Sequence, residues 1–327
     1  MKIGFKLGLS KGGPAIFMAR LKEALKKNNL VKTSFFFDPT IDLILTQNTP
    51  KNIWKKPYVL RLDNFFYSAH FSKKEYHKLN SPIIKSIQNS NGLVYQSKFS
   101  KFAINKLITV KKKIPNEIIH NGVDLKRFNK NGKNLRKNFG INSSDLVFIT
   151  SASFRPIKRL NDIIKSFIAY DKLSLKKKYL IVLGGANDKY KNFPTNIIFS
   201  GEIKHELLPD WYRTGDIFLF FSYIDACPNT VIEALATRLP ILCTNLGGTK
   251  ELVELTNGGI VVNADKPICL LKVNMLKLPK PNYKVIIQGI KKIVKLKNKI
   301  SSEMNLNKID INFVSKKYHR FIKNIKT

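Results

Sequence analysis

Short apolar stretches rich in Val, Ile and Phe recur along this chain, and segments with a helical spacing of apolar residues lie between them. In the first part these stretches predict buried strands at residues 2–7, 33–37, 43–46, 58–62, 93–95 and 117–119. The segment 15–27 is predicted to be a helix, because Phe17, Leu21 and Leu25 share one face at this spacing. Buried strands that alternate with helices are typical of βα units around a parallel sheet.

The segment 129–145 has almost no apolar residues, and we interpret it as the region of a domain boundary. The predicted domains are residues 1–135 and 136–312, followed by a closing amphipathic helix within 313–327. The second domain again alternates, and the predicted strands are 146–151, 179–183, 196–199, 216–221 and 240–244. Its predicted helices are 160–170, 205–213, 229–237, a short helix from residue 249 and a lysine-rich solvated helix over 284–302.

The predicted fold class is therefore α/β, with two Rossmann-like, doubly wound domains. A chain of 327 residues is long enough for two domains of ordinary size. Two such domains in succession imply a central cleft, because ligands bind outside the carboxyl ends of the strands in open α/β sheets.

The charge of the chain is strongly positive, since 58 Lys and Arg face 22 Asp and Glu for a net charge of +36. Such a field attracts nucleic acids, anionic membranes and phosphorylated small molecules alike. Only nine of the 58 basic residues are Arg, the residue that nucleic-acid proteins favour for planar contacts. We favour a generic basic surface of compositional origin, then attraction to a membrane or an anionic acceptor, and nucleic acid least.

The remaining composition excludes several classes of protein. Hydrophobic residues make up 43% and charged residues 24%, as in soluble globular proteins, and no apolar stretch is long enough for a spanning helix. Lys6 and Lys11 interrupt the first residues where a signal peptide needs an apolar run. The three cysteines form no CxxC pair. We expect a cytoplasmic, reduced protein, with peripheral membrane contact as a further hypothesis.

An acidic motif runs from Asp225 to Glu233 and lies between a predicted strand and a predicted helix. Asn229 or Thr230 is predicted to cap that helix, whose first N–H groups and positive dipole end then face the cleft. Such a helix end is a site for anions. The two carboxylates suit hydrogen bonds from sugar hydroxyls. The alternative interpretation is a surface Asp near a turn and a Glu that caps the first helical turn.

This motif and the segment LPILCTNLGGTKELV that follows it resemble the nucleotide-sugar domain of family 4 glycosyltransferases, which are retaining enzymes of the GT-B fold. The family pattern has an acidic residue, seven others and Glu-Ala, then Gly-x-Pro and a Gly-Gly-x-x-Glu turn. Here Asp225 stands where Glu is usual, and Arg238 stands where Gly is preferred. The resemblance implies that Glu233 binds the ribose, that Asp225 binds sugar hydroxyls, and that Asn229 and Thr230 lie near phosphate and sugar.

Further segments extend the resemblance over about residues 93–262. Residues 118–124 are similar to the interdomain segment of the family, and 151–160 to a strand and loop that bind the donor diphosphate. The resemblance implies that Arg155 and Lys158 bind this diphosphate, although the commoner family spacing would place the Arg at Ser153. Residues 1–135 then form the acceptor side, and residues 136–312 hold the nucleotide sugar.

Two candidate sites lie in the first domain. Gly12 and Gly13 follow a predicted strand, where glycines allow a phosphate or sugar to approach the backbone, although a plain turn is an alternative. Their position is similar to the glycine-rich first loop of the family, so we assign them to the diphosphate. Asp63 ends a predicted strand, near where the family often has a His or Asp facing the anomeric carbon. Asp63 is our catalytic candidate, and a turn-capping role is its alternative.

No metal site or cofactor motif is predicted. The five His have no ligand spacing, and the sequence contains no DxD pair, P-loop or GxGxxG. The combined hypothesis is a retaining, metal-independent glycosyltransferase of hexosyltransferase type, which uses a nucleotide diphosphate sugar as co-substrate and no cofactor. Its acceptor is a glycan, a lipid-linked molecule or another acceptor. The alternatives are a GT-B sugar-nucleotide epimerase and a basic nucleic-acid-binding protein.

Overall fold

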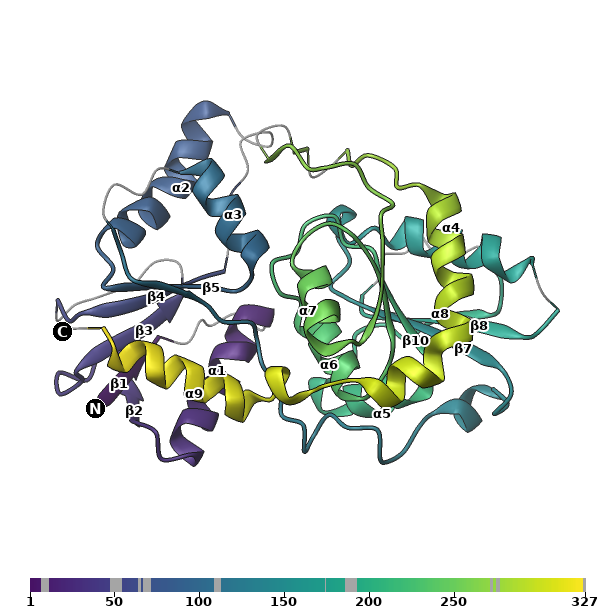
Figure 1. Ribbon diagram of the computed structural model, residues 1–327, viewed down its shortest axis with the longest axis horizontal. Helices are drawn as coiled ribbons and strands as arrows, with labels where there is room; N and C mark the ends of the chain where they lie inside the picture. Colours follow the sequence, from purple (N-terminus) through teal and green to yellow (C-terminus); the bar gives the residue numbers. More distant parts are fainter. Residues whose placement is uncertain are drawn as a thin grey trace.

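The computed structural model describes residues 1–6, 12–47, 55–63, 66, 72–108, 113–173, 175–185, 193–270, 273–274 and 277–325. Within these residues the chain forms two six-stranded parallel sheets, each with helices on both faces (Figure 1). This arrangement confirms the prediction of two doubly wound α/β domains.

The first sheet has the strand order β2-β1-β3-β4-β5-β6. Its strands are β1 (Lys2–Phe5), β2 (Lys32–Phe35), β3 (Leu43–Gln47), β4 (Tyr58–Leu62), β5 (Gly92–Tyr95) and β6 (Asn116–Ile118). One face packs against α1 (Gly13–Lys27) and α9 (Ile311–Lys323), and the other against α2 (Lys73–Gln88) and α3 (Lys98–Leu107) (Figure 1).

The second sheet has the order β12-β11-β10-β7-β8-β9. Its strands are β7 (Leu146–Ser151), β8 (Lys178–Leu183), β9 (Ile197–Phe199), β10 (Ile217–Phe220), β11 (Ile241–Thr244) and β12 (Gly259–Val262). The helices that cover it are α4 (Leu160–Asp171), α5 (Leu208–Thr214), α6 (Asn229–Ala236), α7 (Thr249–Thr256) and α8 (Tyr283–Glu303).

The last helix of the chain returns to the first domain. The rings of Phe17 in α1 and Tyr318 in α9 lie 6.1 Å apart, and both belong to the same buried core. The two chain segments that connect the domains bind each other, because Val123 N–H donates to Ile309 O at 2.8 Å. The N- and C-termini therefore lie at the same end of the molecule (Figure 1). The domain boundary at residue 135 remains a prediction.

Some predicted elements differ from the structure. The helix predicted over 205–213 is a 3-10 turn, His205–Leu207, followed by α5, and Pro209 stands in the first turn of α5, where its missing N–H costs no helical hydrogen bond. Helices α2 and α3 and strand β12 lie in segments for which no element was predicted. Residue 7 of the first predicted strand lies outside the described residues. Among the helices of the described residues, none is both long and apolar enough to cross a membrane.

Candidate functional site

The two domains meet through loops that follow the carboxyl ends of their strands. On one side are Gly13 after β1, Lys98 after β5 and Asn121 after β6. On the other side are the start of α6 after β10 and the start of α7 after β11. The structure thus places the candidate site where ligands bind in open α/β sheets.

Helix α6 begins without a side-chain cap. Pro228 occupies the N-cap position, and its side chain has no acceptor for the first N–H groups of the helix. The prediction that Asn229 or Thr230 caps α6 is wrong, because Asn229 is the first helical residue and its side chain contacts the first domain. The N–H groups of the first turn are left for another partner, which is the condition for an anion site at a helix end.

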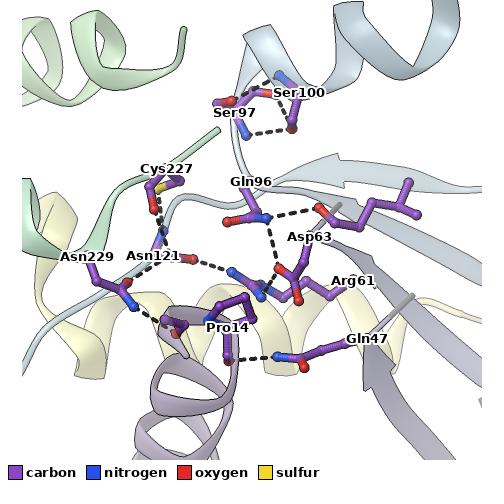
Figure 2. A network of polar contacts seen from close by, with 12 residues as sticks. Pro14, Gln47, Arg61, Asp63, Gln96, Ser97, Ser100, Asn121, Cys227 and Asn229 are labelled. Carbon is purple, nitrogen blue, oxygen red and sulfur yellow. Dashed lines mark hydrogen bonds and ion pairs between the residues drawn. The ribbon is translucent and has the colours of Figure 1, made fainter. Parts of the chain in front are cut away.

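Asn229 belongs to a chain of hydrogen bonds that crosses between the domains (Figure 2). Its Nδ2 donates to Gly13 O at 2.8 Å, and its Oδ1 accepts from Asn121 Nδ2 at 2.9 Å. Asn121 Oδ1 in turn accepts from Arg61 Nη2 at 2.6 Å. Gly13 is thus brought to the start of α6, and its role at the diphosphate stays a prediction. Residues 10 and 11 of the same loop lie outside the described residues.

The series of hydrogen bonds ends at Arg61 and Asp63, inside the first domain. The Arg61 side chain is fully buried, and its guanidinium lies 4.3 Å from the centre of the Phe17 ring. It forms an ion pair with Asp63, whose side chain is 2% exposed and also accepts from Gln96 Nε2 at 2.8 Å. Burial raises the pKa of Asp63 to about 6, against the opposing effect of Arg61. In this arrangement the carboxylate is directed toward its neighbours (Figure 2).

Asp225 and Lys158, predicted for the sugar and the diphosphate, form an ion pair with each other. Their side chains are 17% and 15% exposed, so the pair remains within reach of solvent. Asp225 O accepts from Gly248 N–H at 2.7 Å, within the Gly-Gly turn. A Cβ at Gly248 would lie 1.9 Å from Ala226 O, which explains the glycine at this close approach. Arg155 is exposed and has no ion pair among the described residues.

Glu233 of α6 is 2% exposed, and its carboxylate contacts α1 and the 3-10 turn before α5. Its Oε1 accepts from Arg20 Nη2 at 2.8 Å and lies 3.0 Å from His205 Nε2. Arg20 belongs to α1 and also donates to Gly122 O at 2.7 Å, so a first-domain residue fixes the predicted ribose ligand of the second domain. The roles of Arg20 and His205 were not predicted from the sequence.

Glu251, the acidic residue of the Gly-Gly-x-x-Glu turn, also crosses between the domains. Its carboxylate accepts from the backbone N–H groups of Lys98 and Phe99, each at 2.8 Å, at the start of α3. Burial opposes ionisation of Glu251, but hydrogen bonds from His120 and from these N–H groups outweigh it and hold its pKa below the ordinary value. Its place in the family motif was the available signal for this role.

Known proteins are similar to this chain in two ways, and the first concerns sequence. Residues 131–272 match the profile of the family described as Glycosyl transferases group 1. The match covers less than half of the chain. The resemblance to family 4 glycosyltransferases drawn from the sequence is thereby confirmed.

Two curated relatives match part of the chain. One is the alpha-galactosylglucosyldiacylglycerol synthase of Streptococcus pneumoniae, which is 24% identical over 127 residues, 37% of this chain and 34% of the relative. The other is the lipopolysaccharide core biosynthesis mannosyltransferase LpsB of Rhizobium meliloti, which is 28% identical over 172 residues, 46% of this chain and 47% of the relative. The chain thus matches less than half the length of each.

The second similarity concerns structure. Anabaena Alr3699/HepE, solved in complex with UDP-glucose, superposes with a TM-score of 0.71 at 15% identity and covers 99% of both chains. At this identity the likeness shows the fold alone. The glycosyltransferase domain and the two facing parallel sheets establish the predicted GT-B architecture for this chain.

Proposed function

We propose that this protein is a retaining glycosyltransferase, which transfers a hexosyl group from a nucleotide diphosphate sugar to an acceptor. The observation that carries the proposal is the uncapped start of α6 at the domain interface, next to the acidic motif of a group 1 glycosyl transferase domain. The name of HepE's bound ligand, UDP-glucose, is consistent with this class of donor.

The proposed donor contacts begin with the Lys158–Asp225 ion pair. An arriving diphosphate replaces Asp225 as the partner of Lys158, and the freed carboxylate of Asp225 accepts hydrogen bonds from the sugar hydroxyls. Arg155 approaches the same diphosphate from its exposed position. The ion pair supports this proposal, because it keeps the two side chains together and within reach of solvent.

The remaining donor contacts come from α6 and from the first domain. The first-turn N–H groups at Asn229 and Thr230 face phosphate and sugar, and Gly12 and Gly13 allow the first domain to approach the diphosphate. Glu233 binds the ribose hydroxyls through its carboxylate, which Arg20 and His205 already orient.

Stabilisation of the leaving diphosphate is the main catalytic device of this proposal. Negative charge grows on the diphosphate in the transition state, and donors fixed in advance around it lower the barrier. Lys158, Arg155 and the start of α6 supply such groups, so the proposed reaction needs no metal ion. Asp63 remains our candidate for the residue that faces the anomeric carbon.

The proposed acceptor is a glycan or a lipid-linked molecule. The names of the two relatives point to this class, since one acts in diacylglycerol glycolipid synthesis and the other in lipopolysaccharide core synthesis. The net charge of +36 supports peripheral contact with an anionic membrane. We further propose that the protein works in the cytoplasm.

A binding screen with nucleotide sugars tests the donor proposal, with binding and slow hydrolysis followed by mass spectrometry. The variant Glu233→Gln keeps acceptors for Arg20 and His205 but removes the charge that strengthens hydrogen bonds from the ribose. Donor affinity should fall by about 1.5–3 kcal/mol. The exposed Glu254 supplies a matched control, Glu254→Gln, which should bind as the wild type does.

Two outcomes contradict this proposal. If no nucleotide sugar binds to the wild type, the protein is not a glycosyltransferase of this kind, and tight binding of oligonucleotides would instead support a nucleic-acid function. If Glu233→Gln lowers only the melting temperature and leaves donor affinity unchanged, Glu233 has a structural role. Conversion of the donor into its epimer without an acceptor would identify an epimerase.

A further inference from the structure

Arg159 has a backbone conformation that glycine favours. Its φ is 54° and its ψ is 40°, which lie in the left-handed region. A bulky side chain makes this conformation costly, and residues strained in this way cluster at functional sites. Arg159 directly follows Lys158, the proposed diphosphate ligand, at the point where a 3-10 turn ends and α4 begins. The strained residue is therefore the chain neighbour of a proposed donor contact.

The Arg159 side chain is held in the interior of the second domain. It is 1% exposed, and its Nη1 donates to both carboxylate oxygens of Asp265, at 2.8 and 3.0 Å. Its Nη2 donates to Pro279 O at 2.7 Å, and the guanidinium lies 4.6 Å from the centre of the Tyr223 ring. Asp265 is 2% exposed, so removal of its cation would leave a buried charge unpaired. These contacts hold Arg159 in its left-handed conformation.

Asp265, which anchors this side chain, is tied to the Gly-Gly turn. Its N–H donates to Asn245 Oδ1 and its O accepts from Asn245 Nδ2, each at 3.1 Å. Asn245 precedes the turn, in which Gly248 N–H donates to Asp225 O at 2.7 Å. Asp225 in turn pairs with Lys158. The anchor is therefore connected to the same loops that hold the Lys158–Asp225 ion pair.

We propose that Arg159 is a positioning residue, which holds Lys158 in place for the donor diphosphate through the buried contacts with Asp265 and Pro279. Arg159 does not itself touch the donor, because its side chain is buried, whereas Lys158 is 15% exposed. A ligand held in place in advance loses less freedom when the donor binds. The fixed backbone is a feature of this loop alone, but the consequence for the diphosphate rests on the proposed function.

Arg238 provides a matched control, because it has the same backbone conformation at another place in the domain. Its φ is 60°, and its Nη1 donates to Ser301 O at 2.8 Å, near the end of α8. Arg238 lies between α6 and β11, at the amino end of that strand. Arg159 instead follows the carboxyl end of β7, where the candidate site lies. The two arginines thus share the strain and the anchored side chain but differ in their distance along the strands from the site.

Isothermal titration calorimetry of the full chain with UDP, GDP and ADP tests this assignment. A nucleoside diphosphate lacks the sugar, so its affinity does not include the proposed sugar contacts of Asp225. Arg159→Gly removes the anchor but suits the left-handed backbone, and it should raise the dissociation constant about tenfold, near the lower limit for loss of a charged hydrogen bond. Arg238→Gly makes the same change and should bind as the wild type does. Unchanged affinity in Arg159→Gly, or an equal loss in Arg238→Gly, would overturn the assignment.

A double-mutant cycle separates positioning of Lys158 from a general structural role. If Arg159 acts through Lys158, Lys158→Met/Arg159→Gly should bind a nucleoside diphosphate as Lys158→Met does, within about twofold. Additive losses would overturn the assignment. Arg159→Lys keeps a cation beside Asp265 but lacks the second N–H group for Pro279 O, so its loss should be smaller than that of Arg159→Gly. Where Arg159→Gly does not fold, Arg159→Gly/Asp265→Asn takes its place, because it leaves no buried carboxylate unpaired.

Amide hydrogen exchange distinguishes failure of this inference from failure of the proposed function, because it needs no donor. Lys158 N–H donates to Arg155 O at 2.8 Å, and Tyr223 N–H donates to Ile157 O at 2.9 Å. Both amides should exchange faster in Arg159→Gly than in the wild type, and at the wild-type rate in Arg238→Gly. Unchanged exchange in Arg159→Gly would overturn the positioning role. Faster exchange in a protein that binds neither nucleoside diphosphates nor nucleotide sugars would leave Arg159 as the anchor of this loop and contradict the glycosyltransferase proposal.

Discussion

The two sides of the domain interface hold their polar groups in different ways. In the second domain, Lys158 and Asp225 pair with each other and remain 15% and 17% exposed. In the first domain, Arg61 and Asp63 form an ion pair whose side chains are 0% and 2% exposed. An accessible pair can exchange its partner for a ligand, whereas a buried pair must stay satisfied for the domain to remain folded. The difference supports the proposed donor contacts of Lys158 and Asp225, and it indicates that Arg61 and Asp63 also stabilise the first domain.

The largest expected effect is on stability, and it comes from removing Arg61 from the buried Arg61–Asp63 ion pair. Arg61→Met leaves Asp63 in the interior without its cation, and the free energy of unfolding should fall by about 3–5 kcal/mol. Urea denaturation followed by circular dichroism measures this change. Lys158→Met opens the accessible pair and should cost about 1 kcal/mol or less, because water reaches Asp225. Equal losses in the two variants would remove the contrast between the two sides.

The second expected effect concerns donor affinity, for which the larger loss is expected at Lys158 and not at Arg61. Lys158→Met should weaken nucleotide-sugar binding by about 1.5–3 kcal/mol, because it removes a charged hydrogen-bond donor to the diphosphate. Isothermal titration calorimetry measures the affinity. Lys165→Met, which changes an exposed lysine on α4, should bind the donor normally. Arg61→Met, studied at a temperature where it is folded, should also retain donor affinity, and its failure to do so would add Arg61 to the proposed donor contacts of the first domain.

The contrast also explains which parts of the site could be predicted from the sequence. Asp225, Glu233 and the Gly-Gly turn are close together along the chain, so a local motif identifies them. The partners that complete them are distant: Arg20 is 213 positions from Glu233, and Lys98 is 153 positions from Glu251. Only the packing of the two domains brings such pairs together. No local pattern contains that information.

The same reasoning applies to the elements. Except for β12, the strands of both sheets were predicted, because most of them are short apolar runs. Helix α2 was missed although Ser72 and Glu75 form a capping box at its start, a signal that was available in the sequence; Pro82 within it weakened the helical pattern. The error at the start of α6 arose because Asn229 is a favourable N-cap residue, and its recruitment by Gly13 depends on the other domain.

A smaller effect on stability is expected from the protonation of Asp63 in the buried pair. Burial raises the pKa of Asp63 from 3.8 to about 6, so the folded state binds a proton more tightly than the unfolded state does. Stability from this group is fully present below the unfolded value and is lost as pH rises through the folded value of about 6. Urea midpoints of the wild type should fall, relative to Asp63→Asn, as pH rises from about 4 to about 6.

The control for this titration is Asp63→Asn itself, which has no carboxyl group at this position. A pH dependence that survives unchanged in Asp63→Asn would show that another group carries it. If Asp63 also faces the anomeric carbon as a carboxylate, the transfer rate should rise with pH through the same region.

The smallest expected effect is that of metal removal. In the proposed mechanism Lys158, Arg155 and the N–H groups at the start of α6 already balance the charge of the leaving diphosphate, so a divalent ion has no remaining task there. Transfer measured in excess EDTA should proceed at the same rate as with added magnesium or manganese. Lys158→Met sharpens the test, because a metal that partly restored its activity would be acting at the diphosphate in place of the lysine. Complete loss of wild-type transfer in EDTA, with recovery on addition of magnesium, would contradict this mechanism. It would show that a metal ion is needed to balance the charge of the leaving diphosphate.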